Sequence, residues 1–125
     1  MNGAVMSFWA EDGVFEFPGR TPISGRHVGK PAVRAFFSRL FGELETMRFR
    51  IRHAALANPV GLFWSNVLFV EWTVDETTRE GVSVHNEGVT VIRLRRGKAV
   101  SGRDCFFDPT IVDAAWPDGT MTGTA

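Results

Sequence analysis

Residues 31–53 read PAVRAFFSRLFGELETMRFRIRH, and the spacing of their apolar residues changes part-way along. At first the apolar side chains recur every three or four residues behind a proline, which suits the first turn of a helix because no amide partner is needed there. Further on the period becomes two, with Phe49, Ile51 and His53 on one face and arginines on the other. The stretch therefore predicts a helix over 31–44 followed by a strand.

The flanking segments extend this pattern in both directions. Ahead of it, residues 1–10 suit a short helix, residues 14–17 a short strand and the Gly- and Pro-rich residues 18–30 a loop. Helix, strand, helix and a four-strand antiparallel meander make an α+β domain with its helices on one face of the sheet. After the strand that contains Phe49, the meander is expected to continue with strands at 62–74, 82–95 and 99–107, joined by a turn at 58–61, a loop at 75–81 and a tight turn at 96–98.

Length and charge limit the class of protein. The chain has 125 residues, 14 basic and 14 acidic side chains and 44% hydrophobic residues, which suit one domain over residues 1–115 and a flexible tail over 116–125. A net charge of zero argues against a nucleic-acid partner, because binding phosphates takes many cations. No apolar run approaches the roughly 20 residues of a membrane span, and no signal peptide opens the chain. We therefore expect a cytoplasmic protein without nucleic-acid or membrane partners.

The residues that bind metals are few and scattered. Cys105 is the single cysteine, and the three histidines have no compact spacing. We therefore predict no metal and no cofactor.

Two expected strands, 62–74 and 86–94, are apolar on both faces. One face of each can pack on the helices, but a chain of this size has no second layer to cover the other. A homodimer packed through the sheet would cover that face.

Three segments carry the motifs of a known family: FWAEDGVFEFP at 8–18, GKPAVRAFF at 29–37 and GKAVSGRDCFFD at 97–108. They resemble the SnoaL-like group of the nuclear-transport-factor-2-like superfamily, which includes polyketide cyclases, ketosteroid isomerases and limonene-epoxide hydrolases. The resemblance implies a cone-shaped, curved and mainly antiparallel sheet wrapped around helices (cystatin-like), with a shortened first helix. Because many activities share this fold, the motifs indicate the fold better than the reaction.

Asp104 is the candidate catalytic acid or base. Alternation along its strand puts Gly102, Asp104 and Phe106 on one face. An aspartate on an otherwise apolar strand loses hydration, which raises its pKa toward the range useful for proton transfer. The resemblance implies the same role, because the matching aspartate of the cyclases and epoxide hydrolases is a catalytic acid or base inside the cone. The alternative is that Asp104 only ties down neighbouring backbone, with Arg103 as its ion partner.

Four further polar residues are candidate partners of Asp104. Thr90 falls where the cyclases carry a histidine, and a hydroxyl there can orient a carbonyl or water but cannot shuttle a proton at neutral pH. Asn86 shares the face of Thr90 and could donate a hydrogen bond to an enolate oxygen. Glu71 is a second acid in an apolar pocket, or else an edge or dimer-contact charge. His53 is either a satisfied core histidine or a base in the pocket.

The aromatic residues favour an apolar pocket or an aromatic core. The chain has 11 Phe, 4 Trp and no Tyr, so the tyrosine donor of the ketosteroid isomerases is missing. Apolar side chains with a few polar groups are typical of ligand pockets. The candidate substrate-binding residues are Phe15, Phe17, Phe37, His53, Phe69 and Phe106. The same phenylalanines could instead form nothing more than a Phe-rich core.

Together these features predict an enzyme that performs cofactor-free acid–base chemistry on a hydrophobic carbonyl compound. Cyclisation, isomerisation and dehydration all fit the candidate residues. The competing interpretations are a non-catalytic module that binds a small ligand and a dimerisation module of the same fold.

Overall fold

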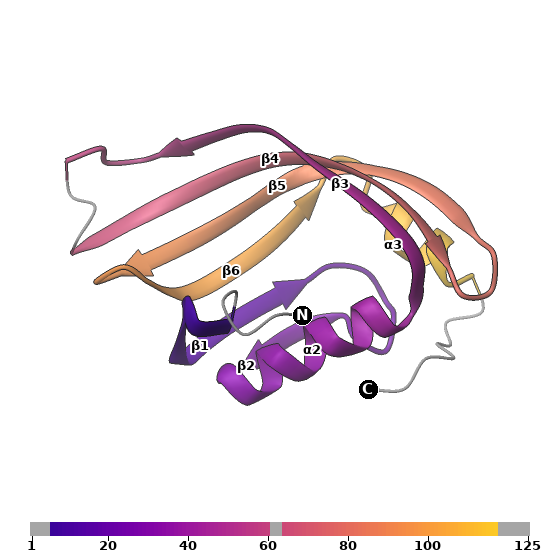
Figure 1. The fold of residues 1–125 in the computed structure, drawn as a ribbon, viewed down its shortest axis with the longest axis horizontal. Coiled ribbons are helices and arrows are strands. Elements are labelled where there is room, and N and C mark those ends of the chain that lie inside the picture. The colour runs from indigo at the N-terminus through magenta and orange to yellow at the C-terminus, as the bar shows by residue number, and fades with distance from the viewer. Residues whose placement is uncertain (1–5, 61–63, 118–125) are drawn as a thin grey trace.

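The structure, a computed structural model, describes residues 6–60 and 64–117 of the chain. These residues form one six-stranded sheet and two helices (Figure 1). In chain order the elements are β1 (Trp9–Phe17), β2 (Gly25–Val28), α2 (Lys30–Gly42), β3 (Leu44–Leu56), β4 (Ser65–Thr78), β5 (Ser83–Arg95), β6 (Lys98–Phe106) and α3 (Thr110–Ala115).

The described strands form one curved sheet in the order β2-β1-β6-β5-β4-β3. Neighbouring strands run antiparallel except β1 and β6, which pair in parallel. The sheet arches over α2, so that α2 lies on its concave side (Figure 1). This arrangement confirms the expected α+β class, and β3 to β6 are the expected four-strand meander.

The predicted change of period coincides with the junction of α2 and β3. The helix ends at Gly42 and the strand begins at Leu44. Val33 and Phe36 are buried on the face of α2 that turns toward the sheet, as the three- and four-residue spacing predicts.

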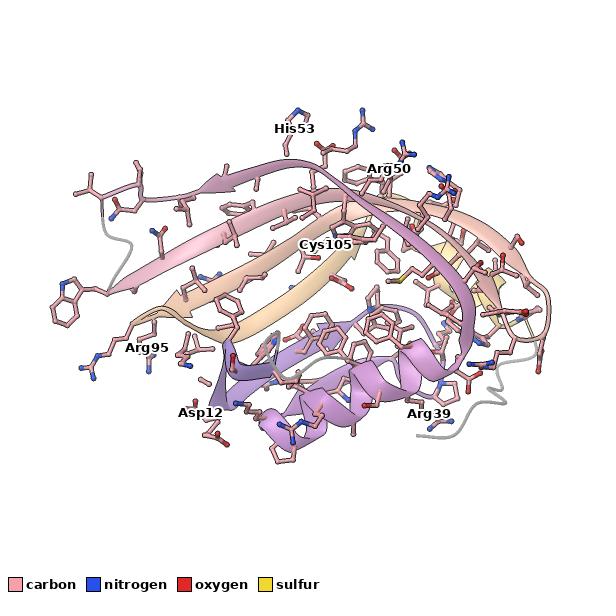
Figure 2. The ribbon with its side chains drawn as sticks, viewed as in Figure 1. Asp12, Arg39, Arg50, His53, Arg95 and Cys105 are labelled. Carbon is pink, nitrogen blue, oxygen red and sulfur yellow. The ribbon has the colours of Figure 1, made fainter. Side chains whose placement is uncertain are left out.

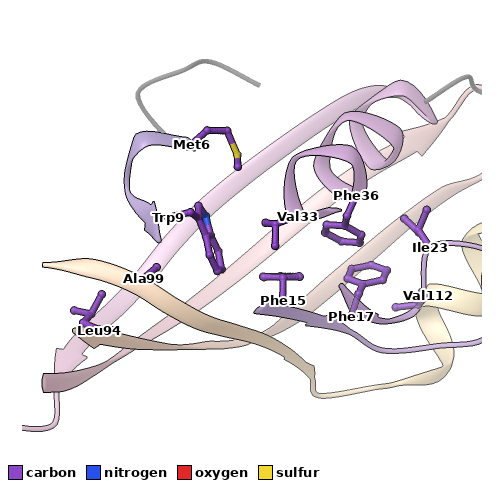
Figure 3. Close-up of a cluster of buried hydrophobic side chains, with 10 residues drawn as sticks. All are labelled: Met6, Trp9, Phe15, Phe17, Ile23, Val33, Phe36, Leu94, Ala99 and Val112. Atoms are coloured by element: carbon purple, nitrogen blue, oxygen red, sulfur yellow. The ribbon is translucent and has the colours of Figure 1, made fainter. Parts of the chain in front are cut away.

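The main core lies between α2 and the concave face of the sheet (Figure 3). The ring of Phe36 lies 5.0 Å from the ring of Phe15 and 5.0 Å from that of Phe17. Each such buried aromatic side chain contributes about 1.5–3 kcal/mol to folding. The buried members are Met6, Trp9, Phe15, Phe17, Ile23, Val33, Phe36, Leu94, Ala99 and Val112.

Two glycines on the concave face let aromatic side chains lie directly on the strands. A Cβ added to Gly102 would stand 2.9 Å from atoms of both the Phe15 and Trp9 rings. A Cβ added to Gly88 would overlap the backbone carbonyl oxygen of Cys105 and would stand 3.1 Å from the Trp72 ring. The close approach of β5 and β6 at this point therefore requires glycine at Gly88, where the obstacle is backbone.

Several element boundaries differ from those predicted. Strand β4 continues to Thr78, so most of the loop expected at 75–81 is strand, because β3 pairs with it over that whole length. The short strand β2 and the six-residue helix α3 had no periodicity long enough to reveal them. Of the residues predicted as a short helix at 1–10, Met6 and Ser7 are helical, Trp9 begins β1, and residues 1–5 lie outside the described part.

The C-terminal boundary also moves. Trp116, assigned to the tail by the sequence, is 4% exposed and packs in a small cluster with Leu44 and Ala115. An indole of that size is buried because α3 carries it back under the end of the sheet. The rest of the predicted tail, residues 118–125, lies outside the described residues.

We expect Gly88→Ala to destabilise the domain by about 1–3 kcal/mol, because overpacking a close strand contact displaces backbone. Gly102→Ala is the matched control: its methyl group meets only side chains, which can move, so the loss should be smaller. Urea unfolding of both variants measures the difference. A Gly88→Ala variant as stable as the parent would contradict this account of the sheet.

Candidate active site

Asp104 of β6 and Thr90 of β5 stand directly opposite each other in the sheet. Both lie on the concave face, in line with Gly102 and Phe106, as alternation along β6 predicts. Asp104 is half-buried, so a ligand on this face can reach it.

A directed chain of hydrogen bonds ends at Asp104. The indole Nε1 of Trp72 donates to Thr90 Oγ1 over 2.8 Å, and Thr90 Oγ1 donates to Asp104 Oδ1 over 2.6 Å. An indole can only donate, so the single hydroxyl proton of Thr90 is directed to the carboxyl group. The chain crosses β4, β5 and β6, and it holds the Asp104 side chain in one orientation.

Burial raises the pKa of Asp104 to about 6, and the hydrogen bond from Thr90 opposes part of that rise. At this pKa the carboxyl group exchanges its proton near neutral pH. A group that both takes and gives a proton in this range is suited to general acid–base chemistry.

The surroundings of Asp104 are aromatic. The Phe106 ring meets the Trp72 ring edge-on at 5.3 Å and the Phe17 ring at 5.7 Å. Phe106 and Phe37 keep part of their surface exposed, whereas Phe15 and Phe17 are buried in the core. Of the predicted substrate-binding phenylalanines, Phe37 and Phe106 therefore remain able to touch a ligand on the concave side.

Comparison with known proteins identifies the family and the fold. The family model of the SnoaL-like domain matches residues 3–102. The chain belongs to the SnoaL-like family.

Solved structures share the fold of this SnoaL-like domain. A nuclear-transport-factor-2-like protein of unknown function from Burkholderia pseudomallei has a TM-score of 0.75 and 22% identity, over 89% of this chain and 81% of its own. Bal32a, from a soil-derived mobile gene cassette, has a TM-score of 0.73 and 25% identity, over 90% and 81%. TerC, co-crystallised with polyporic acid, has a TM-score of 0.68 and 21% identity, over 89% and 82%. Among curated proteins, none matches the chain.

Three predicted site residues of the SnoaL-like domain lie on the opposite, convex face. Glu71 is in register with Val89, the neighbour of Thr90, so its side chain points to the face opposite Thr90. Phe69, two residues before Glu71 on the same strand, points to that face as well. His53 joins them because a β-bulge after Ile51 shifts the register, and its Nδ1 lies 2.7 Å from Glu71 Oε1. Figure 2 shows His53 on the side of the sheet away from α2. The structure therefore does not bring these three residues to the face that carries Asp104.

Asn86 lies on the expected face but not beside Asp104. It is 2% exposed, and its Oδ1 accepts a hydrogen bond from the backbone N–H of Glu87 over 3.0 Å. It precedes Thr90 by four residues, or about 13 Å of strand. Asn86 therefore lies further along the same face than Thr90, and its predicted catalytic role stays a prediction.

Two residues of interest escaped the sequence analysis. Trp72 orients Thr90, but the pairing joins positions 18 residues apart and depends on a strand register that alternation cannot supply. Glu76 is the other: burial raises its pKa to about 7, and it borders a hollow of about 700 Å³ at the hairpin end of β4 and β5. Glu76 lies six residues along β4 from the level of Asp104, about 20 Å away, so the two acids cannot share one reacting atom.

Residues 6–60 and 64–117 bring together no three His, Cys, Asp or Glu side chains that could hold a metal ion. None of the helices within those ranges has the length and apolar character needed to cross a membrane.

We expect Thr90→Val to raise the pKa of Asp104 further, because it removes the hydrogen bond that favours the carboxylate. It also leaves the Trp72 N–H without its acceptor, which should cost about 1–3 kcal/mol of stability. Thr90→Ser keeps the hydroxyl and should change neither property much. Carboxyl titration by NMR and urea unfolding measure the two effects, and an unchanged Asp104 pKa in Thr90→Val would contradict the hydrogen-bond chain.

Proposed function

We propose that this SnoaL-like domain is a small-molecule enzyme that performs cofactor-free acid–base chemistry on a hydrophobic carbonyl compound. The observation that carries the proposal is the Asp104 carboxyl group, oriented by Thr90 on an aromatic concave face and given a pKa of about 6 by burial.

One group must both remove and return the proton in this scheme. Asp104 Oδ1 accepts from Thr90, so Oδ2 is the oxygen that takes a proton from the carbon next to the substrate carbonyl. The hydroxyl proton of Thr90 and the indole proton of Trp72 are both already donated. The protonated Asp104 then gives its proton to a nearby carbon or oxygen of the same substrate. Isomerisation, cyclisation and dehydration all satisfy this balance.

The aromatic rings favour an apolar substrate. Trp72, Phe106 and Phe37 surround or border the concave face near Asp104, and such rings bury flat apolar groups well. The polyporic acid in the TerC structure supports a small organic ligand for this fold.

A non-catalytic alternative draws on the same hydrogen bonds. The chain from Trp72 through Thr90 to Asp104 ties three neighbouring strands together, and a purely structural aspartate would do the same. The two interpretations differ in what Asp104 contributes to stability.

Asp104→Asn tests the proposal through activity. In D2O, the parent should catalyse exchange of the α-protons of a panel of hydrophobic ketones, at a rate that rises as pH passes about 6 and Asp104 ionises. The variant should lose at least about 100-fold of that rate, the usual contribution of a general base. NMR follows the exchange, and a variant as active as the parent would rule out Asp104 as the base.

The same variant separates catalysis from a structural role. Because the folded-state pKa of Asp104 is raised, the native state holds its proton between pH 4 and pH 6 while the unfolded state loses it. Stability from this group is therefore complete below pH 4 and falls as pH rises through 6. Asp104→Asn removes that fall. The difference in free energy of unfolding between variant and parent should therefore be more favourable to the variant at pH 8 than at pH 4, by on the order of 1–3 kcal/mol. A loss of stability at pH 8 would instead support the structural role.

The proposed enzyme is a homodimer through the convex face. At the centre of that face Phe69 is 40% exposed and Cys105 is exposed. Around them stand charges of both signs, including Arg52 at 3.3 Å from Glu87. An apolar centre with charges of both signs around it is the composition of many protein–protein interfaces, which favours a second copy of the chain as its occupant.

We expect Phe69→Glu to convert the dimer to a monomer, because it places a charge in the apolar centre of the interface. Val60→Glu, at an exposed apolar residue away from this patch, should leave the dimer intact. Analytical ultracentrifugation distinguishes the two species. A parent chain that sediments as a monomer would contradict the dimer.

A further inference from the structure

Two chain connections meet at the end of the sheet that lies away from α3. The turn between β5 and β6 contacts the start of β4, where the backbone N–H of Arg96 donates to the carbonyl oxygen of Trp64 over 2.9 Å. Arg95, just before this turn, projects from that end of the sheet (Figure 2). We name the surface formed by Val60, Trp64, Arg93, Arg95 and Arg96 the basic tip.

The basic tip exposes large apolar side chains. Trp64 is 67% exposed and Val60 is 92% exposed. The other tryptophans, Trp9, Trp72 and Trp116, are each between 4% and 6% exposed. Exposed apolar side chains at one end of a molecule are a feature of surfaces that bind another apolar phase.

Positive charge collects beside these apolar residues. Arg93, Arg95 and Arg96 are exposed, and the sequence has no acidic residue between Glu87 and Asp104. The neighbouring strand connection adds no charge, since no ionisable residue occurs between His53 and Glu71.

A hollow of about 370 Å³ adjoins the basic tip and shares Arg93 and Arg95 with it. Its lining includes the guanidinium-bearing side chains Arg93 and Arg95 together with Asn58 and Ser65. Arg93 and Arg95 share one face of β5, because the buried Leu94 between them points into the core. Guanidinium and hydroxyl donors gathered in this way suit the phosphate oxygens of a headgroup.

A second group of arginines, the basic stripe of Arg48, Arg50 and Arg52 on β3, has different surroundings. Arg48 is in register with Asp75, and Arg52 lies 3.3 Å from Glu87, so its cations stand among acids. Only at the basic tip do unneutralised arginines within the described residues adjoin an exposed tryptophan.

We propose that the basic tip docks on the surface of an anionic lipid bilayer. Tryptophan is favoured at the headgroup level, and arginines beside it are attracted to anionic lipids. Stable interfacial binding takes both signals together, which the basic tip supplies. A nucleic acid fits less well, because its charged phosphate backbone offers no apolar contact for Val60 and no partner for the uncharged connection between β3 and β4.

This inference revises the expectation of no membrane partner. That expectation rested on the absence of a long apolar run and on a net charge of zero for the whole chain. Peripheral docking needs neither a span nor an overall charge, because headgroups respond to charges within about a Debye length of roughly 8 Å.

Co-sedimentation with vesicles tests the proposal. The full chain should bind vesicles containing phosphatidylglycerol and not vesicles of phosphatidylcholine alone, and added salt should release it. Arg95→Gln combined with Arg96→Gln should weaken binding about 30-fold, since each cation near an anionic surface contributes about fivefold. Arg48→Gln combined with Arg50→Gln removes the same charge from the other stripe and should bind as the parent does.

Fluorescence gives a second readout that does not depend on the charge variants. Vesicle binding should shift the emission of exposed Trp64 to the blue, and Trp64→Phe should lose that shift while still binding. Equal binding to both vesicle types, equal loss in the two arginine pairs, or binding only to an oligonucleotide or to inorganic phosphate would each overturn the proposal. All the substituted residues are exposed, and circular dichroism verifies that the variants fold.

Discussion

Phe36 of α2 stacks on Phe15 of β1, and this contact holds the helix over one part of the concave face. The helix is anchored over β1 and β2, so it packs on one half of a sheet whose other half is built from β4 and β5. Two aromatic side chains of the sheet itself, Trp72 and Phe106, lie between the half under the helix and the other half. Asp104 stands at that boundary, and there it is desolvated enough for its pKa to rise while staying within reach of a ligand.

The features that local pattern determines were predictable. Alternation along one strand is enough to place Gly102, Asp104 and Phe106 on one face, and helical spacing is enough to find α2. The motif segments found the family, because backbone geometry constrains their residue types.

The features that depend on pairing between strands were not predictable. The bulge after Ile51 moves His53 to the convex face, and nothing within β3 itself signals the extra residue. The same holds for Trp72, whose link to Thr90 exists only because β4 and β5 adopt one particular register. The burial of Glu76 could not be predicted, because the polar sequence at 75–81 is typical of a loop and Glu76 lies in the part of it that continues β4. Whole-chain charge was misleading in a related way, since an average over 125 residues conceals a segment with only cations.

The parallel pairing of β1 with β6 has a consequence for how the chain acquires its fold. Trp9 near the beginning lies beside Ala99 near the end, so the centre of the sheet closes only when both are present. Contacts of such long sequence separation form slowly, because the chain loses the entropy of closing a large loop before the contacts stabilise it. During synthesis β3, β4 and β5 can pair first, while β1 keeps one edge unpaired until β6 has left the ribosome. Until β6 (Lys98–Phe106) is available, the edge of β1 that it covers stays open to pairing with another chain.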